Sequence, residues 1–397
     1  MARFALSGGS LLQFTDRGRL SFVPRRALLV DGERIAGTVP EGDVPSEWPR
    51  IAAGEGPRWV IPGLVDTHLH LAHDGQDVAQ KAEPDPMVSL RMHMNARLNL
   101  QSGVTAMRDV GAKHHIDVAF RHARRKGLIV VPFVFISGKP IIATGGHCYY
   151  MGREADGPDE VARAVREQLK AEVDWIKLMV TGGVMTPGME VSAQQLTDAE
   201  IAAAVATATM AGRPVAAHAQ AGPGVTAALR AGVRTLEHGL QLTDTDIGLI
   251  LERDVYYIPT LTAFTQIAED GPRLGLPEYA IEKARKAVAM HSESFRRALA
   301  AGVRIAVGTD LRHGTILLEM RRMHELGMPI DRVLHAATLG AAQAIGQDHA
   351  MGDLGQGKYA NVVVLDADPL RDLGALERIR RVYLAGRLVW EDGRWLA

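Results

Sequence analysis

Hydrophobic and polar positions alternate in blocks through the middle of the chain. Longer segments, in which apolar residues recur every three or four positions, separate eight short apolar runs at residues 59–65, 104–107, 128–136, 175–180, 214–218, 235–238, 256–261 and 305–308. Short apolar strands that alternate with amphipathic helices are typical of a parallel sheet joined by crossover helices. We therefore predict an α/β fold, a (β/α)8 TIM barrel with its active site at the carboxyl ends of the strands.

Local signals mark where the intervening helices begin and end. Pro158 suits a first helical turn, and Thr197 with Glu200 forms a capping box. Glycines that we expect to end helices stand just before the next strand, at Gly103, Gly127, Gly212, Gly232 and Gly302.

Both ends of the chain contain short β-type pieces separated by turn residues. Such pieces occupy residues 4–6 and 27–30 near the start, and 361–365, 382–384 and 387–390 near the end. Each end has too few strands for a stable sheet, so we predict one small composite β-sandwich. Residues 1–58 and 358–397 would form the sandwich, and residues 59–357 the barrel.

Side chains with metal-binding chemistry stand where the apolar runs stop. His68 and His70 follow the first run, and side chains at i and i+2 of a strand share one face. Because the chain has 15 histidines, two of them could stand one residue apart by chance, and the alternative is that both side chains are simply solvated. The other runs supply Lys177, His218, His238 and Asp310, in that order. Strand ends of a barrel converge, so we expect these groups to form one site.

Composition excludes several classes of function. The formal net charge of -1 gives no field to attract nucleic acid or an anionic membrane. No uncharged apolar run approaches the roughly 18 residues of a membrane span, and the first twenty residues lack the apolar core of a signal peptide. Cys148 is the only cysteine, which excludes an intrachain disulfide. We expect a cytoplasmic protein that binds a small-molecule substrate and forms a homo-oligomer.

The motifs resemble those of the amidohydrolase superfamily, in its binuclear branch with a carboxylated lysine. The resemblance rests on residues 62–70 (PGLVDTHLH), on the order His-x-His, Lys, His, His, Asp, and on residues 357–366 (GKYANVVVLD). Residues 181–188 (TGGVMTPG) resemble imidazolonepropionase-like enzymes and Xaa-Pro or Xaa-Arg dipeptidases. The resemblance implies a metal-dependent hydrolase on the predicted fold.

By the same resemblance, two divalent metal ions, Zn by preference, would be held at the strand ends. His68, His70 and Asp310 would bind one ion, and His218 and His238 the other. Lys177, converted by carbon dioxide to a carbamate, would bridge the two ions together with a hydroxide. Asp310 would also relay the proton. For Lys177, the alternative is a buried lysine that pairs with a carboxylate. For Asp310, the alternative is the N-cap of the following helix.

Loop residues are candidates for substrate contacts. His147, after Gly145 and Gly146, would polarise the scissile carbonyl, the alternative being a solvated loop histidine. Relatives often carry tyrosine where this chain has Gln241 and histidine where it has Gln220. Both positions would lie near the substrate, and we expect Gln241 to contact it. Residues that would read a substrate carboxylate, unless they are ordinary surface residues, are Arg153, Arg312 and His313.

We predict hydrolysis of an amide C–N bond, in a dipeptide or an N-acyl amino acid. One alternative is a one-metal deaminase or cyclic-amide hydrolase like imidazolonepropionase, which does not require Lys177. A second is a metal-free barrel that serves as a binding subunit, which the intact set of ligand residues disfavours.

Overall fold

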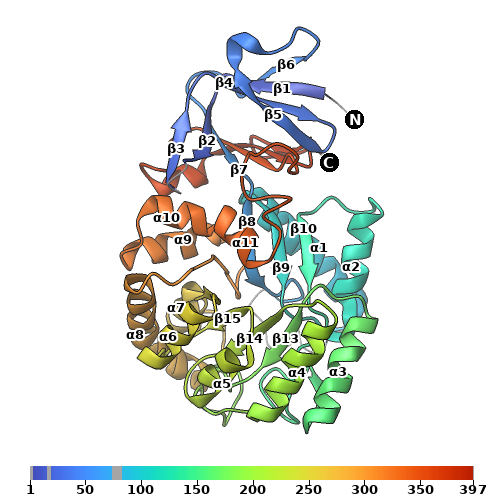
Figure 1. Ribbon diagram of the computed structural model, residues 1–397, viewed down its shortest axis with the longest axis vertical. Helices are drawn as coiled ribbons and strands as arrows, with labels where there is room; N and C mark the ends of the chain where they lie inside the picture. The colour runs from blue at the N-terminus through green and yellow to red at the C-terminus, as the bar shows by residue number, and fades with distance from the viewer. Residues whose placement is uncertain (1–2, 16–18, 74–82, 397) are drawn as a thin grey trace.

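Strands from both ends of the chain lie side by side in one sheet. The computed structural model describes residues 3–15, 19–73 and 83–396. Its seven-stranded sheet has the order β20 (Arg394–Trp395), β19 (Arg387–Glu391), β18 (Ile379–Leu384), β17 (Val362–Leu365), β7 (Trp59–Pro62), β2 (Ser10–Phe14) and β3 (Leu20–Val23). The early strands and the late strands of the chain therefore meet at one end of the molecule (Figure 1).

A second sheet, formed by early strands alone, packs against this one. Its order is β5 (Arg34–Pro40), β4 (Arg26–Asp31), β1 (Arg3–Ser7) and β6 (Arg50–Ala52). Leu28 and Val30 of β4 share an apolar core with Leu11 of β2 and Val362 of β17, and all four are at most 1% exposed. The two sheets are thus held together by the burial of apolar side chains.

The strands of the α/β part run parallel, so the α/β class predicted from the sequence is confirmed. One sheet has the order β10 (Phe133–Ile136), β9 (Val104–Asp109) and β8 (Leu64–Leu69). The other has the order β12 (Arg153–Glu154), β11 (Ile141–Ile142), β13 (Ile176–Met179), β14 (Val215–Ala219), β15 (Thr235–His238) and β16 (Tyr256–Ile258).

Backbone hydrogen bonds join these two sheets at both sides. The amides of Asp174 and Trp175 donate to the carbonyl of Ile136, at 2.9 and 3.1 Å. On the other side, residues 304–310 bond to both β16 and β8, for example from Thr67 N to Val307 O at 2.9 Å and from Asp310 N to His68 O at 2.7 Å. The carboxyl ends of β8, β13, β14 and β15 therefore face a common space that residue 310 also enters.

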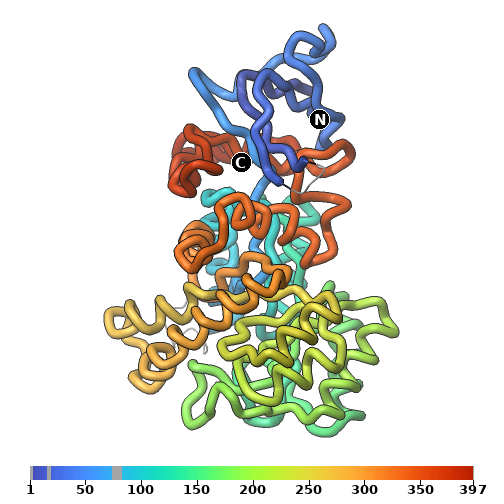
Figure 2. The backbone as a smooth tube through the Cα atoms, turned by 60° about the vertical axis from the view of Figure 1, so that its left-hand side comes forward, coloured from blue at the N-terminus to red at the C-terminus, as the bar shows by residue number. Residues whose placement is uncertain are grey.

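Helices cover the outside of the parallel strands (Figures 1 and 2). They are α1 (Asp85–Gln101), α2 (Ile116–Arg125), α3 (Pro158–Lys170), α4 (Asp198–Met210), α5 (Pro223–Ala231), α6 (Asp244–Glu252), α7 (Leu261–Asp270), α8 (Glu278–Ala300), α9 (Ile316–Glu325), α10 (Ile330–Ala336) and α11 (Leu339–Ala344), with short 3₁₀ turns at Glu41–Asp43, Lys113–His115 and Leu373–Glu377. Pro158 begins α3, and Thr197 with Glu200 forms the predicted capping box of α4. The five glycines predicted to end helices all have positive φ.

Four of the predicted strands differ in the structure. The runs at residues 128–136 and 256–261 are strands only at Phe133–Ile136 and Tyr256–Ile258, and α7 begins at Leu261. The run at residues 59–65 is divided at Gly63, because the Gly63 amide bonds to Asn361 O and the Leu64 amide to Gly103 O. A Cβ at residue 63 would lie 2.1 Å from Thr105 Oγ1, so the close approach requires glycine. β7 consequently joins the terminal sheet, and only β8 joins the parallel strands. The run at residues 305–308 makes isolated bridges instead of a regular strand.

Within the described ranges, no helix is long and apolar enough to cross a membrane.

Candidate active site

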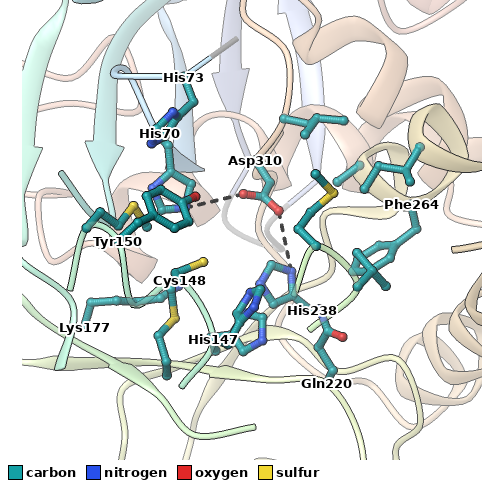
Figure 3. Close-up of a pocket in the computed structure, with 18 of the residues that line it drawn as sticks. His70, His73, His147, Cys148, Tyr150, Lys177, Gln220, His238, Phe264 and Asp310 are labelled. Carbon is teal, nitrogen blue, oxygen red and sulfur yellow. Dashed lines mark ion pairs between the residues drawn. The ribbon is translucent and has the colours of Figure 1, made fainter. Parts of the chain in front are cut away.

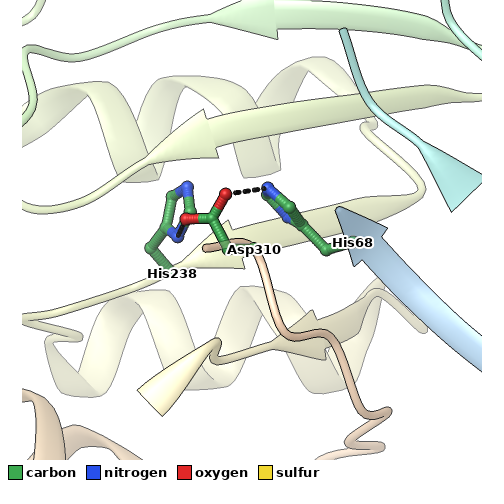
Figure 4. A group of neighbouring side chains, drawn as sticks. All are labelled: His68, His238 and Asp310. Carbon is green, nitrogen blue, oxygen red and sulfur yellow. Dashed lines mark ion pairs between the residues drawn. The ribbon is translucent and has the colours of Figure 1, made fainter. Parts of the chain in front are cut away.

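Asp310 lies beside His68 and His238 at the carboxyl ends of the strands (Figure 4), and His70 is also close to it. Its Oδ1 is 3.3 Å from His68 Nε2 and 3.5 Å from His70 Nε2, and its Oδ2 is 4.0 Å from His238 Nδ1. One ligand atom from each of His68, His238 and Asp310 fits within a span of 4.8 Å. This spacing brings ligand-type atoms from three parts of the chain within reach of a bound cation.

Three residues in and beside the site have a left-handed backbone conformation. His238 and Asp310 have φ values of 74° and 62°, and Thr260 has a φ of 53°. Such values are uncommon for residues with a Cβ and cluster at functional sites. Thr260 Oγ1 lies 2.8 Å from His238 Nδ1 and helps to fix that ring.

His68, His70 and His218 each donate a ring N–H to a carboxylate or carbonyl oxygen. His68 Nδ1 donates to Glu237 Oε2 at 2.6 Å, His70 Nδ1 to Gly111 O at 3.0 Å, and His218 Nε2 to Gly182 O at 3.1 Å. In His70 and His218 the second ring nitrogen is left as a lone-pair donor, as in ligated histidines. Burial lowers the pKa of His70 to about 3 and the pKa of His218 well below its usual value, so these rings are neutral near pH 7.

Lys177 is a buried amine without a hydrogen-bond partner among the described residues. Its side chain lies inside β13, is 1% exposed and lines the same cavity as His70, His218 and Asp310. Burial lowers its pKa to about 8, although Glu237 and Asp310 oppose the shift. A buried amine that titrates this low is available as the neutral nucleophile at moderate pH.

The pKa of Asp310 shifts in the opposite sense to a simple buried acid. Burial would raise it, but His68, His238 and His70 outweigh burial and hold it well below its usual range. The site therefore offers an ionised carboxylate, neutral imidazoles and an unpaired amine that can become a carbamate. This donor set fits divalent metals that accept nitrogen and oxygen ligands.

A buried ion pair beneath the site was missed by the sequence analysis. Arg108 donates to Glu237 Oε1 at 2.8 Å and to Thr67 O at 2.6 Å, and both charged side chains are fully buried. Glu237 in turn holds His68. Two signals in the sequence could have revealed it. Glu237 is a charged residue inside an apolar run, directly before His238, and Arg108 directly follows the apolar run at residues 104–107.

We predict that Glu237→Gln weakens both the fold and the metal site. The change leaves the Arg108 guanidinium buried and uncompensated, which typically costs about 3–5 kcal/mol of unfolding free energy. It also loosens the His68 ring, which typically lowers metal affinity about 10–100-fold. Urea denaturation and competition titration with zinc measure the two effects.

Glu325→Gln is the matched control, because Glu325 pairs with Arg322 at 3.1 Å with its side chain 61% exposed. Exposed pairs contribute little, so no measurable change is expected. Wild-type stability and zinc affinity in Glu237→Gln would contradict the role of the buried pair.

A cavity of about 140 Å³ opens over these groups (Figure 3). His147 lies in its wall, 6% exposed, with Nδ1 2.7 Å from Thr186 Oγ1 and its ring centroid 4.6 Å from that of His218. Gly183 is needed beside it, because a Cβ there would lie 2.4 Å from the His147 ring. The cavity thus brings His147 together with His70, Lys177, His218, His238 and Asp310.

Four predicted substrate-binding residues do not line this cavity. Arg153 is bound by Glu167 at 2.7 Å and Glu160 at 3.2 Å, and Arg312 by Asp270 at 3.1 Å. The His313 ring donates to His73 O at 2.7 Å, and Gln241 is exposed. Gln220 does line the cavity, where the sequence analysis noted only its departure from histidine.

Comparisons with known proteins agree on the family. A model described as Amidohydrolase family matches residues 59–389. Ochratoxinase from Aspergillus niger is 30% identical over 93% of this chain and 82% of its own length. Imidazolonepropionase from Micrococcus luteus is 25% identical over 86% of this chain and 87% of its own length. A crystal structure of a Xaa-Pro dipeptidase with methionine bound in its active site has a TM-score of 0.89 at 29% identity, covering 98% and 100% of the two chains.

These matches support a hydrolase of a class that acts on small molecules and usually uses a divalent metal. The chain belongs to the amidohydrolase family. The resemblance inferred from its motifs is thereby confirmed at the level of the family.

Proposed function

We propose that this protein is a binuclear metal-dependent hydrolase that cleaves an amide C–N bond in a dipeptide or an N-acyl amino acid. The observation that carries the proposal is the amine of Lys177, which has no hydrogen-bond partner among the described residues and lines one cavity with five histidines and Asp310. The names of the ochratoxinase and dipeptidase relatives favour the same reading.

The proposed scaffold is a (β/α)8 barrel with a composite β-sandwich from residues 1–58 and 358–397. Hydrogen bonds from residues 304–310 to both β16 and β8 support a closed barrel. Since β7 pairs with β17, we place the start of the barrel at Gly63 instead of residue 59. The cytoplasmic location and the homo-oligomeric state stay predictions.

His68, His70 and Asp310 would hold one divalent ion, His218 and His238 the other, and Lys177 both. When bound, the ions would supply an activated water and an electrophile for the substrate carbonyl. For its part, the neutral amine of Lys177 would add to carbon dioxide with loss of one proton. The resulting carbamate would provide two oxygens that share one negative charge, where the free ammonium would repel a cation.

One side chain would transfer the proton, and a second would polarise the substrate carbonyl. Asp310, held ionised by its histidines, accepts a proton as the attacking oxygen bonds to the carbonyl carbon, and returns it to the leaving nitrogen. His147 Nδ1 lies 2.7 Å from Thr186 Oγ1. In the tautomer in which this hydroxyl donates to Nδ1, His147 Nε2 would carry a proton and would donate to the substrate carbonyl oxygen.

The alternative is a one-metal cyclic-amide hydrolase or deaminase, which the imidazolonepropionase relative favours. Lys177 discriminates between the two, because a one-metal site has no need of a bridging carbamate.

We expect zinc-loaded protein to contain two metal ions per chain and to hydrolyse dipeptides or N-acyl amino acids in preference to cyclic ureas and aminopurines. Metal analysis and a screen of these classes, assayed for free amine and for ammonia, test this. One ion per chain with ammonia release, or with ring opening of cyclic ureas alone, would favour the alternative.

A further inference from the structure

One wall of the cavity is made of apolar side chains. Phe264 and Ile267 come from α7, and Leu276 precedes α8; all three line the cavity and are at most 7% exposed. Val184 and Met185, from the loop after β13, face the same space. The Phe264 ring stands beside His238, with 5.8 Å between ring centroids, so the apolar wall adjoins the candidate metal ligands (Figure 3).

Helix α8 holds this wall in place. Tyr279 Oη donates to Met185 O at 3.1 Å, and Lys283 Nζ donates to Thr186 O at 2.9 Å. Thr186 also contacts His147. The wall is therefore preformed, and the group that occupies it lies next to the candidate carbonyl-polarising residue.

The charges around the cavity do not favour an ionic group at this wall. Within the described part of the chain no arginine lines the cavity, and Lys177 is its only lysine. Arg153 and Arg312 are engaged by carboxylates elsewhere. A charged substrate group placed against Phe264 and Ile267 would lose its hydration without gaining a partner.

Gln220 supplies a neutral polar contact in the same cavity. It is 2% exposed, and its Oε1 has no hydrogen-bond partner among the described residues. A buried amide oxygen in this state is costly unless a ligand donates to it. A substrate N–H beside the apolar group would satisfy it.

We propose that the site selects substrates by a bulky, uncharged apolar acyl group or amino-terminal side chain, seated against Phe264, Ile267 and Leu276, with Gln220 accepting from an adjacent N–H. The inference rests on the proposed amide hydrolysis and names its substrate class. Each methylene buried against this wall is expected to improve binding about threefold to fourfold.

The test uses the zinc-loaded full chain and a series of N-acylglycines with acetyl, butanoyl, hexanoyl and 4-phenylbutanoyl groups. kcat/KM is expected to rise at least tenfold from acetyl to hexanoyl. Glutarylglycine, which carries a carboxylate at the far end of its acyl group, is expected to be no better than acetylglycine. Equal rates across the series, or a preference for glutarylglycine, would overturn the inference while leaving amide hydrolysis intact.

Variants locate the effect. Ala263→Leu fills the cavity wall and is expected to lower kcat/KM for hexanoylglycine at least fivefold relative to acetylglycine. Ile267→Val is expected to shrink the preference for hexanoyl without loss of fold, with Ile51→Val, on a side chain 37% exposed in β6, as the matched control. An unchanged preference in both cavity variants would overturn the assignment of the wall.

Binding separates this inference from the proposed function. Calorimetry with acetamide, butanamide, hexanamide and 4-phenylbutanamide needs no turnover, and the dissociation constant is expected to fall along the series and to respond to Ala263→Leu. If no acylglycine is hydrolysed but binding follows the chain length, the proposed function fails and the apolar subsite stands. If binding is independent of chain length, the subsite fails.

Discussion

Lys177→Ala is expected to lose at least about 100-fold in kcat and to bind fewer than two metal ions per chain. Residues that merely orient metal ligands already cost about 10–100-fold when they are changed, and Lys177 is proposed to be a ligand of both ions. The alanine removes the carbamate and enlarges the cavity that His70, His218 and Asp310 also line. Metal analysis and steady-state kinetics on zinc-loaded protein measure both losses.

Added short carboxylic acids, such as acetate or propionate, are expected to restore part of the activity, because their two oxygens can replace those of the carbamate. Lys170→Ala, at the exposed end of α3, is the matched control and should behave as wild type. Full metal content and full turnover in Lys177→Ala would refute the bridging role.

Asp310→Asn is expected to lower kcat about 10²–10⁴-fold, the usual contribution of a positioned acid-base group. The histidines around Asp310 hold its pKa well below its usual range, so the wild-type carboxylate is ionised at assay pH. The asparagine oxygen still contacts the histidines but cannot accept and return a proton. Turnover measured at saturating substrate, with zinc content and melting temperature recorded in parallel, isolates the chemical step.

The control for this variant is Asp348→Asn, on an exposed side chain away from the site. Near-normal turnover in Asp310→Asn with zinc bound would mean that another residue moves the proton. Loss of zinc together with loss of turnover would limit Asp310 to the role of a ligand.

Much of the fold could be predicted from the local pattern of apolar and polar residues. Apolar runs predicted β9, β13, β14 and β15 at nearly their observed positions, and the capping box at Thr197 predicted the start of α4. The division at Gly63 could not be predicted, because it depends on hydrogen bonds to Gly103 and Asn361, far away in the sequence.

For the site, the sequence by itself determined which ligand-type side chains stand at strand ends, since strand periodicity and the end of an apolar run are local properties. Tertiary structure alone decided which distant groups they meet. Glu237 on β15 reaches Arg108 on β9 and His68 on β8, and α7 and α8 bring the apolar wall beside His238. Arg153 and Arg312 do not line the cavity, because they pair with Glu167 and Asp270. A buried ion pair or an apolar wall forms only where folding brings residues distant in the sequence into contact, so local patterns cannot predict it.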